Sequence, residues 1–178
     1  MANYKIVFTG PVGAGKTTAI GSLSDIEVVK TDAQASDMTR LRKNETTVAM
    51  DYGMMKISED ERVHLYGTPG QERFDFMWEI LAGGSIGLVL LLDNSRADPF
   101  KDLRFFLNAF SSFVNSRRVV IGVTRMDVSS KPDLSDYYEA LRPLKIVPPV
   151  FEVDARKRED VATLVRALLY VVDPGLDE

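Results

Sequence analysis

The stretch Gly10–Thr17, GPVGAGKT, fits the pattern G-x-x-x-x-G-K-[ST] and lies between a strand-like segment and a helix-like one. Glycines at this spacing let backbone N–H groups wrap around phosphate oxygens, and the lysine adds a cation beside the β- and γ-phosphates. The threonine offers a hydroxyl to Mg²⁺, and the N-terminus of the helix favours an anion. The residues expected to hold a nucleoside triphosphate are Gly10, Gly13, Ala14, Gly15, Lys16, Thr17 and Thr18. The motif identifies neither the base nor the reaction.

A second polar group, TRMD, ends in Asp127 and follows an apolar run. Its carboxylate can accept hydrogen bonds from N1–H and the exocyclic amine of guanine, whereas adenine has no donor at N1 and no such amine. The apolar stem of Arg125 can cover the base. An aspartate after a strand is usually a helix cap, so this interpretation depends on the phosphate loop. With the backbone N–H groups after the next strand, the predicted guanine-binding residues are Thr124, Arg125, Asp127, Ala155 and Arg156.

Two more segments could act on the γ-phosphate. Thr47 ends a polar segment that starts at Asp25 and has no clear period, and such a segment can be ordered by a γ-phosphate and Mg²⁺. Thr47 would give the metal a second hydroxyl, and ordinary loop polarity explains the segment equally well. In the stretch YGTPGQERF, the backbone N–H of Gly70 can bond the γ-phosphate and the amide of Gln71 can orient an attacking water. A surface turn carrying an amide is the alternative there.

Strands alternating with helices are predicted to position these residues. Short apolar runs of the kind found in strands are 5–9, 48–57, 62–66, 85–92, 118–124 and 150–153. Helix-like periods start at Lys16 and recur over 103–114, 133–144 and 161–169. The pattern predicts an α/β fold of the P-loop NTPase type, with a mainly parallel sheet of about six strands flanked by helices and one antiparallel edge strand. Ligands of such sheets bind at the carboxyl ends of the strands.

Length and composition limit the other possibilities. A chain of 178 residues with 45% apolar content predicts a single domain over residues 1–178. A net charge of −4 argues against a nucleic-acid partner, and the lack of cysteine excludes disulfides, thiolate metal sites and thiol catalysis. The chain shows no signal-peptide pattern or myristoylation glycine, and its longest apolar run, 86–92, is too short for a bilayer. We therefore expect a cytoplasmic protein with no direct membrane anchor, which a partner could recruit to a membrane.

The order of the motifs GPVGAGKT, TT, PGQERF, TRMD and DAR resembles that of the Ras-like small GTPase superfamily over nearly the whole chain. The chain is similar to a bacterial branch, the MglA-like and conservon-type GTPases, in HLYGTPGQERF followed by F-M-W and in lacking the usual aspartate before P-G-Q. This resemblance implies a small-GTPase domain that binds GTP or GDP with Mg²⁺ and acts as a molecular switch. Slow hydrolysis would depend on Lys16 and Mg²⁺ neutralising charge and on Gln71 placing water.

The resemblance also implies regulation. Relatives in the bacterial branch bring an arginine in cis from the first switch, for which Arg40 and Arg42 are the candidates; solvated loop charges are the alternative for each. The branch works with small Roadblock-type dimers, so a dimeric regulator of that type is the expected partner. Phe74, Phe76 and Trp78 could form the contact surface, and core packing of one or two of these rings is an equal alternative.

Several residues depart from the Ras-like pattern. Gly67 stands where the family has an aspartate that touches Mg²⁺ mainly through water. We expect GTP binding to persist with a looser metal, because Thr17, Thr47, phosphate oxygens and waters can complete the shell. Asp51 is a conceivable substitute carboxylate and the less favoured explanation. Val12 could crowd the catalytic glutamine or an incoming arginine, which puts intrinsic hydrolysis in doubt.

Two other functions remain open. The chain could be a nucleotide-dependent binding module whose hydrolysis is negligible because of Val12 and Gly67. It could also be a P-loop kinase that uses ATP on a small metabolite. Such an enzyme would tolerate adenine and would need an arginine-rich lid, which the sequence lacks. The TRMD motif favours guanine over that interpretation.

Overall fold

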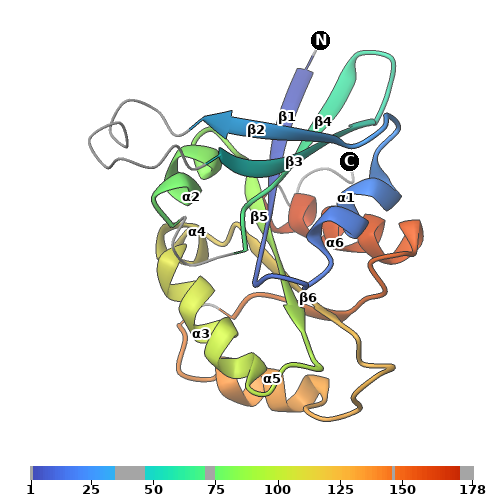
Figure 1. The fold of residues 1–178 in the computed structure, drawn as a ribbon. Coiled ribbons are helices and arrows are strands. Elements are labelled where there is room, and N and C mark those ends of the chain that lie inside the picture. Colours follow the sequence, from blue (N-terminus) through green and yellow to red (C-terminus); the bar gives the residue numbers. More distant parts are fainter. Residues whose placement is uncertain (1, 35–46, 71–74, 146, 173–178) are drawn as a thin grey trace.

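The computed structural model describes residues 2–34, 47–70, 75–145 and 147–172, and Figure 1 shows their arrangement. At its centre is a seven-stranded sheet of order β2-β3-β4-β1-β5-β6-β7. In chain order the strands are β1 (Ala2–Thr9), β2 (Val29–Gln34), β3 (Thr47–Lys56), β4 (Glu61–Gly67), β5 (Gly87–Asp93), β6 (Val119–Thr124) and β7 (Val150–Glu152). β1 is parallel to β4 and β5, and β6 and β7 continue the parallel arrangement. The carboxyl ends of these five strands therefore lie at the same end of the sheet.

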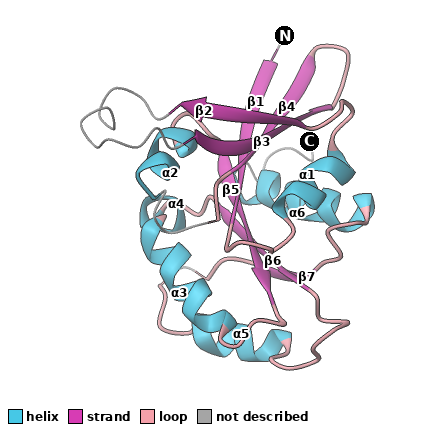
Figure 2. Ribbon diagram, in the orientation of Figure 1, coloured by secondary structure: helices cyan, strands magenta, loops and turns pink. Residues whose placement is uncertain are grey.

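Helices cover both faces of the sheet (Figure 2). They are α1 (Lys16–Leu23), α2 (Asp75–Ala82), α3 (Pro99–Ala109), α4 (Ser111–Asn115), α5 (Leu134–Leu141) and α6 (Arg158–Val172). α1 and α6 share a core cluster with Ile6 and Leu91, whereas α2 to α5 share a second cluster with Val7 and Leu90. Alternate residues of one strand thus face opposite helix layers. β5 and β6 are buried along their whole length, which explains their continuous apolar runs.

The structure confirms the predicted α/β P-loop fold and corrects two details of the sheet. The described part has seven strands rather than about six, and the antiparallel strand is β3, which lies inside the edge. The strand at the edge is β2, which pairs with β3 from Val29 opposite Tyr52 to Gln34 opposite Thr47. Its sequence, VKTDAQ, alternates Val29, Thr31 and Ala33 with polar residues, but only two of its six residues are apolar. So short and polar a pattern is a weak signal for a strand, and an edge strand can be held by its backbone pairing to one neighbour.

The predicted helical segments are present with shifted ends. The predicted helix over 103–114 is part of α3 and α4, which meet at Phe110. The segment 133–144 forms a shorter helix that ends at Leu141 and starts with a capping box at Asp133. α2 has no counterpart in the sequence prediction. Within the described ranges, every helix falls short of the length and apolarity needed to cross a membrane.

Trp78, the only tryptophan of the chain, lies in the core. Its indole stacks on Phe106 with ring centroids 5.0 Å apart, and its Nε1–H donates to the carbonyl oxygen of Pro69 at 3.0 Å. Core packing is therefore the correct alternative for this ring, which is not on a free contact surface. Phe74 and the side chain of Phe76 lie outside the described part of the chain.

Candidate nucleotide-binding site

The loop between β1 and α1 follows a path that requires glycine at two places. Gly10 has a φ of 142°, and a Cβ there would lie 2.1 Å from the carbonyl oxygen of Leu91 on β5. Gly15, the N-cap of α1, has a φ of 98°, and a Cβ there would lie 3.1 Å from the Cβ of Ala155. The loop is thus wound tightly against β5 and the segment after β7. It leads directly into the N-terminus of α1, as an anion site requires.

Lys16 lies inside this loop and is only 8% exposed. Its Nζ donates to the carbonyl oxygens of Gly10 and Pro11 at 2.7 and 2.8 Å. Burial lowers the pKa of the ammonium group to about 8, and the nearby Asp51 carboxylate opposes that shift. The group is therefore mostly charged at neutral pH and lies where phosphates wrapped by the loop would meet it. The adjacent Thr17 is exposed, and its hydroxyl donates to Oδ2 of Asp51.

A cavity of about 350 Å³ opens beside this loop. It is lined by Ala14, Gly15 and Thr18 of the loop, Ser95 after β5, Thr124, Arg125, Asp127 and Val128 at the end of β6, and Val153, Asp154, Ala155 and Arg156 after β7. The structure thus brings together three of the predicted segments, which are far apart in the sequence. The position at the carboxyl ends of β1, β6 and β7 is the one that parallel sheets use for ligands.

Thr124, the last residue of β6, connects the cavity to the phosphate loop. Its buried hydroxyl lies 3.0 Å from the carbonyl oxygen of Ala14 and 3.1 Å from that of Leu92. One hydroxyl proton is therefore shared between the loop and β5. The contact fixes the spacing between the phosphate loop and the end of β6.

Asp127 is exposed at the cavity, and none of the hydrogen bonds within the described ranges involves its carboxylate. Arg156 is arranged differently. Its backbone N–H donates to Asp154 at 3.0 Å, and its guanidinium makes two bonds of 2.8 Å to the same carboxylate. These contacts lower the pKa of Asp154 to about 2. Of the two predicted backbone donors, Arg156 is thus already engaged, which leaves the N–H of Ala155 for a base oxygen.

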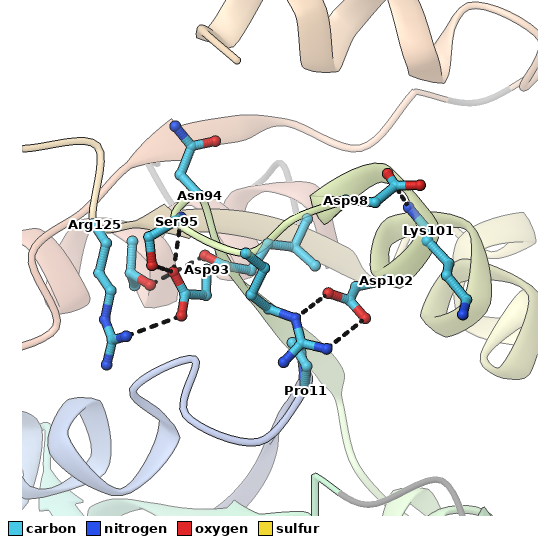
Figure 3. A network of polar contacts seen from close by, with 12 residues as sticks. Pro11, Asp93, Asn94, Ser95, Asp98, Lys101, Asp102 and Arg125 are labelled. Carbon is cyan, nitrogen blue, oxygen red and sulfur yellow. Dashed lines mark hydrogen bonds and ion pairs between the residues drawn. The ribbon is translucent and has the colours of Figure 1, made fainter. Parts of the chain in front are cut away.

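Arg125 is held at the cavity by a carboxylate that the sequence analysis missed. Its backbone is left-handed, with a φ of 60°, and its guanidinium donates to Oδ2 of Asp93 at 3.0 Å (Figure 3). Asp93 is buried at the end of β5, and its Oδ1 accepts from the backbone N–H and the hydroxyl of Ser95 at 2.9 and 2.6 Å. The direction of Arg125 is therefore determined by a buried anion. In the sequence, Asp93 could have been noticed as the acidic residue that ends the apolar run GLVLLLD.

Asn94 is a second residue that the sequence analysis missed. It is fully buried, and its amide donates to the carbonyl oxygens of Ser129 and Pro132 at 2.7 and 2.9 Å. Its Oδ1 accepts from the hydroxyl of Tyr137 on α5 at 2.7 Å. These contacts hold the loop that carries Asp127, so Asn94 positions the base side of the cavity without lining it.

Gly70 lies against the phosphate loop. A Cβ at this position would lie 2.5 Å from the backbone nitrogen of Val12 and 2.8 Å from Nζ of Lys16. Two residues earlier, the hydroxyl of Thr68, which directly follows β4, donates to that of Thr9 at the end of β1 at 2.9 Å in a buried contact. The segment after β4 therefore reaches the side of the loop where Nζ of Lys16 lies, and only a glycine fits at position 70.

The other residues predicted to act on the γ-phosphate are only partly described. Gln71, Arg40 and Arg42 lie outside the described ranges. Thr47 is the first residue of β3, where it pairs with β2 through its backbone. In the part of the chain that the structure describes, no three His, Cys, Asp or Glu side chains gather into a metal-binding cluster. Thr17 and Asp51 present oxygen groups of the kind that could hold Mg²⁺, which proteins bind through one or two such groups together with substrate phosphates.

Comparison with known proteins identifies relatives of this chain. Residues 8–174 match the family described as "Conserved hypothetical ATP binding protein". An uncharacterized protein of Methanocaldococcus jannaschii is 29% identical over 145 residues, which make up 80% of this chain and 82% of that protein. The Ras-related protein RIC1 of Oryza sativa subsp. japonica is 22% identical over 167 residues, or 89% of this chain and 74% of that protein.

Among solved structures, the fold is similar to the G domain of the T. maritima FeoB iron transporter. The TM-score is 0.67 at 18% identity, and the match covers 96% of this chain and 99% of that chain. These likenesses support a P-loop nucleotide-binding protein of the Ras-like, GTPase-type superfamily. They do not distinguish the bacterial branch from the rest of that superfamily.

Proposed function

The chain belongs to the family described as "Conserved hypothetical ATP binding protein"; for this member of the family we propose a switch that binds GTP and GDP rather than ATP and hydrolyses GTP slowly. The carboxylate of Asp127, which lines the same cavity as Ala155, carries the proposal. A guanine ring there meets an acceptor for its N1–H and amine and a donor for its oxygen. An adenine ring has no N1–H to donate, so the carboxylate would lose part of its hydrogen bonding.

Displacement of a fluorescent GDP analogue by unlabelled nucleotides tests the choice of base. We expect GTP and GDP to displace it at concentrations at least about a hundredfold lower than ATP, because each hydrogen bond to a carboxylate contributes about 1.5–3 kcal/mol. Asp127→Asn should shift the preference toward xanthine nucleotides, whose C2 oxygen accepts from the new amide. Glu152→Gln, at an exposed acid that ends β7, is the matched control. Equal displacement by ATP and GTP would refute the proposal and favour an ATP-using kinase.

For hydrolysis, we propose catalysis by positioning and charge without a covalent intermediate. The residues proposed to act are Lys16, Gly70, Gln71 and one of Arg40 and Arg42. Mg²⁺ supplies Lewis-acid charge on the phosphates when it is bound. Val12 is 56% exposed, and its backbone nitrogen would lie 2.5 Å from a Cβ built on Gly70. We propose that its side chain narrows the space around the γ-phosphate and so makes turnover slow.

We further propose that a Roadblock-type dimer regulates the switch and that the protein belongs to the MglA-like and conservon-type branch. The stretch HLYGTPGQERF followed by F-M-W supports both proposals by resemblance. The switch would be a single G domain over residues 1–178 in the cytoplasm, reaching a membrane only through a partner. Single-turnover GTP decay with and without a candidate dimer tests the regulation. If GTP bound to the protein decays no faster than free GTP even when the dimer is present, a binding module without hydrolysis is favoured.

A further inference from the structure

β3 and β4 place Asp51 and Gly67 directly opposite each other. In an antiparallel pair, opposite residues carry their side chains on the same face, with Cβ atoms about 4.5–5.5 Å apart. Gly67 contributes no side chain to that face. Position 51 is therefore the nearest cross-strand position from which a carboxylate can reach the space of an aspartate at position 67.

The room beside Gly67 is in fact used by Asp51. A Cβ built on Gly67 would lie 3.3 Å from the Cβ and 3.5 Å from the Oδ2 of Asp51, and 3.0 Å from Cδ1 of Ile20 in α1. Both positions thus face α1. A larger residue at position 67 would compete with the Asp51 carboxylate for the same volume, so the glycine and the aspartate fit each other.

Gly53 brings β3 close to α1. A Cβ at this position would lie 2.8 Å from Cγ2 of Ile20 and 2.9 Å from the Cβ of Ser24. Residues 51 and 53 share one face of the strand, so a side chain at position 53 would push β3 away from the helix. The close approach at Gly53 therefore carries the Asp51 carboxylate onto the first turn of α1.

The Asp51 carboxylate contacts the phosphate loop at Thr17. Its Oδ2 accepts a hydrogen bond from the hydroxyl of Thr17, the group that a P-loop offers to Mg²⁺. A threonine hydroxyl can give a lone pair to a cation while its proton is donated to a carboxylate, so this bond is compatible with metal ligation.

We infer that Asp51 supplies from β3 the carboxylate that anchors the Mg²⁺ shell, and that Gly67 provides the room for it. The inference rests on the proposed function, because the ion is the one that accompanies a bound nucleotide. It reverses the order of preference drawn from the sequence, in which the loss of the aspartate at position 67 led to a looser metal. The carboxylate is present, on the neighbouring strand.

Release of a fluorescent GDP analogue at increasing Mg²⁺ concentrations tests this anchor. The measured quantity is the Mg²⁺ midpoint, the concentration at which release has slowed halfway from its rate in EDTA to its rate at saturating Mg²⁺. We expect Asp51→Asn to raise that concentration about ten- to hundredfold, as loss of an outer-shell partner does, and to leave the release rate in EDTA within about twofold. The new amide can still accept from Thr17, so the fold should persist. Asp60→Asn, at an exposed acid in the turn of the same β-hairpin, is the charge-matched control. A midpoint for Asp51→Asn equal to that of the control would overturn the inference.

The reciprocal swap, Asp51→Gly with Gly67→Asp, moves the carboxylate back to β4. It should restore the Mg²⁺ midpoint to within about threefold of the unaltered protein, because the two positions serve one volume. A swap variant that has the same unfolding temperature as the unaltered protein but the raised Mg²⁺ midpoint of Asp51→Asn would refute the equivalence of the two positions. Failure of the proposed function has a different signature, since the unaltered protein would then not bind the fluorescent GDP with or without Mg²⁺.

Discussion

Replacing Asn94 with alanine should weaken base recognition while sparing phosphate binding. Two hydrogen bonds of this side chain hold the loop between β6 and α5, where Asp127 lies, and a third joins it to Tyr137 on α5. The phosphate loop receives none of these bonds. A graded companion is Tyr137→Phe, which removes only the donor to Oδ1 of Asn94.

The magnitudes follow from the number of bonds lost. A neutral hydrogen bond contributes about 1 kcal/mol net, and a buried group left without a partner costs about 1–3 kcal/mol. Asn94→Ala should therefore lower the free energy of unfolding by about 3–5 kcal/mol, against about 1–2 kcal/mol for Tyr137→Phe. The release of the loop should reduce the ratio of GDP to ADP affinity about tenfold, since both nucleotides keep the same phosphate contacts.

Urea unfolding followed by the fluorescence of Trp78 measures the first effect, because this buried ring is the only tryptophan. Displacement of fluorescent GDP by GDP and ADP measures the second. Asn108→Ala, at an exposed asparagine on α3, is the control for the loss of an amide. An Asn94→Ala protein that keeps the unaltered ratio of affinities, or loses less than about 1 kcal/mol, would refute the positioning role.

Lys16 and Gly70 give two further predictions. The folded, nucleotide-free chain releases the Lys16 proton near its pKa of about 8, whereas the unfolded chain keeps it up to its pKa of about 10.5. Between these two pH values the unfolded chain binds more protons, so the free energy of unfolding should rise with pH, by at most about 1.4 kcal/mol per pH unit. Urea unfolding at pH 7.5 and 9.5 checks this, and Lys16→Met should lose the gain; the same pH dependence in both proteins would contradict it. In Gly70→Ala the new Cβ prevents the observed approach of residue 70 to Val12, so the backbone N–H of residue 70 should lose its hydrogen bond to the γ-phosphate. The loss of one hydrogen bond to a charged group should make GTP dissociate roughly tenfold faster, with little change for GDP. Stopped-flow release of labelled GTP and GDP measures this against Gly21→Ala, where a Cβ would make only ordinary contact; equal effects on both nucleotides would contradict it.

The parts of the site that the sequence predicted are those whose residues follow one another along the chain. The phosphate loop could be recognised because its glycines, Lys16 and Thr17 act within a single turn of backbone. The strand-to-helix alternation was equally visible, since β5 and β6 are covered on both faces and read as unbroken apolar runs. These local signals were enough for the fold class and for the segments that meet at the cavity.

The parts that were missed depend on contacts between distant segments. Asp93 and Asn94 look like an ordinary polar end of a strand until Arg125 and Tyr137 are brought to them from 32 and 43 residues away. The strand β2 has too short and too polar a pattern to stand out in the sequence, and its pairing with β3 defines it. In each case the meaning of the residue comes from its partner, and the partner is set by the tertiary fold.

Gly67 is the clearest example of a residue whose meaning depends on its partner. The sequence shows only that the usual aspartate is missing from this strand. A motif such as aspartate before P-G-Q is defined in sequence, whereas a metal shell is defined in space. Because positions 51 and 67 are opposite each other in an antiparallel pair, a side chain at either position points into the same space next to α1. A carboxylate can therefore move from one strand to the other while its oxygens stay near Thr17, provided that the residue opposite is small. The physical requirement is one carboxylate and one glycine across the pair, and we expect a chain of this fold with an aspartate on β4 to carry a small residue at the position of Asp51.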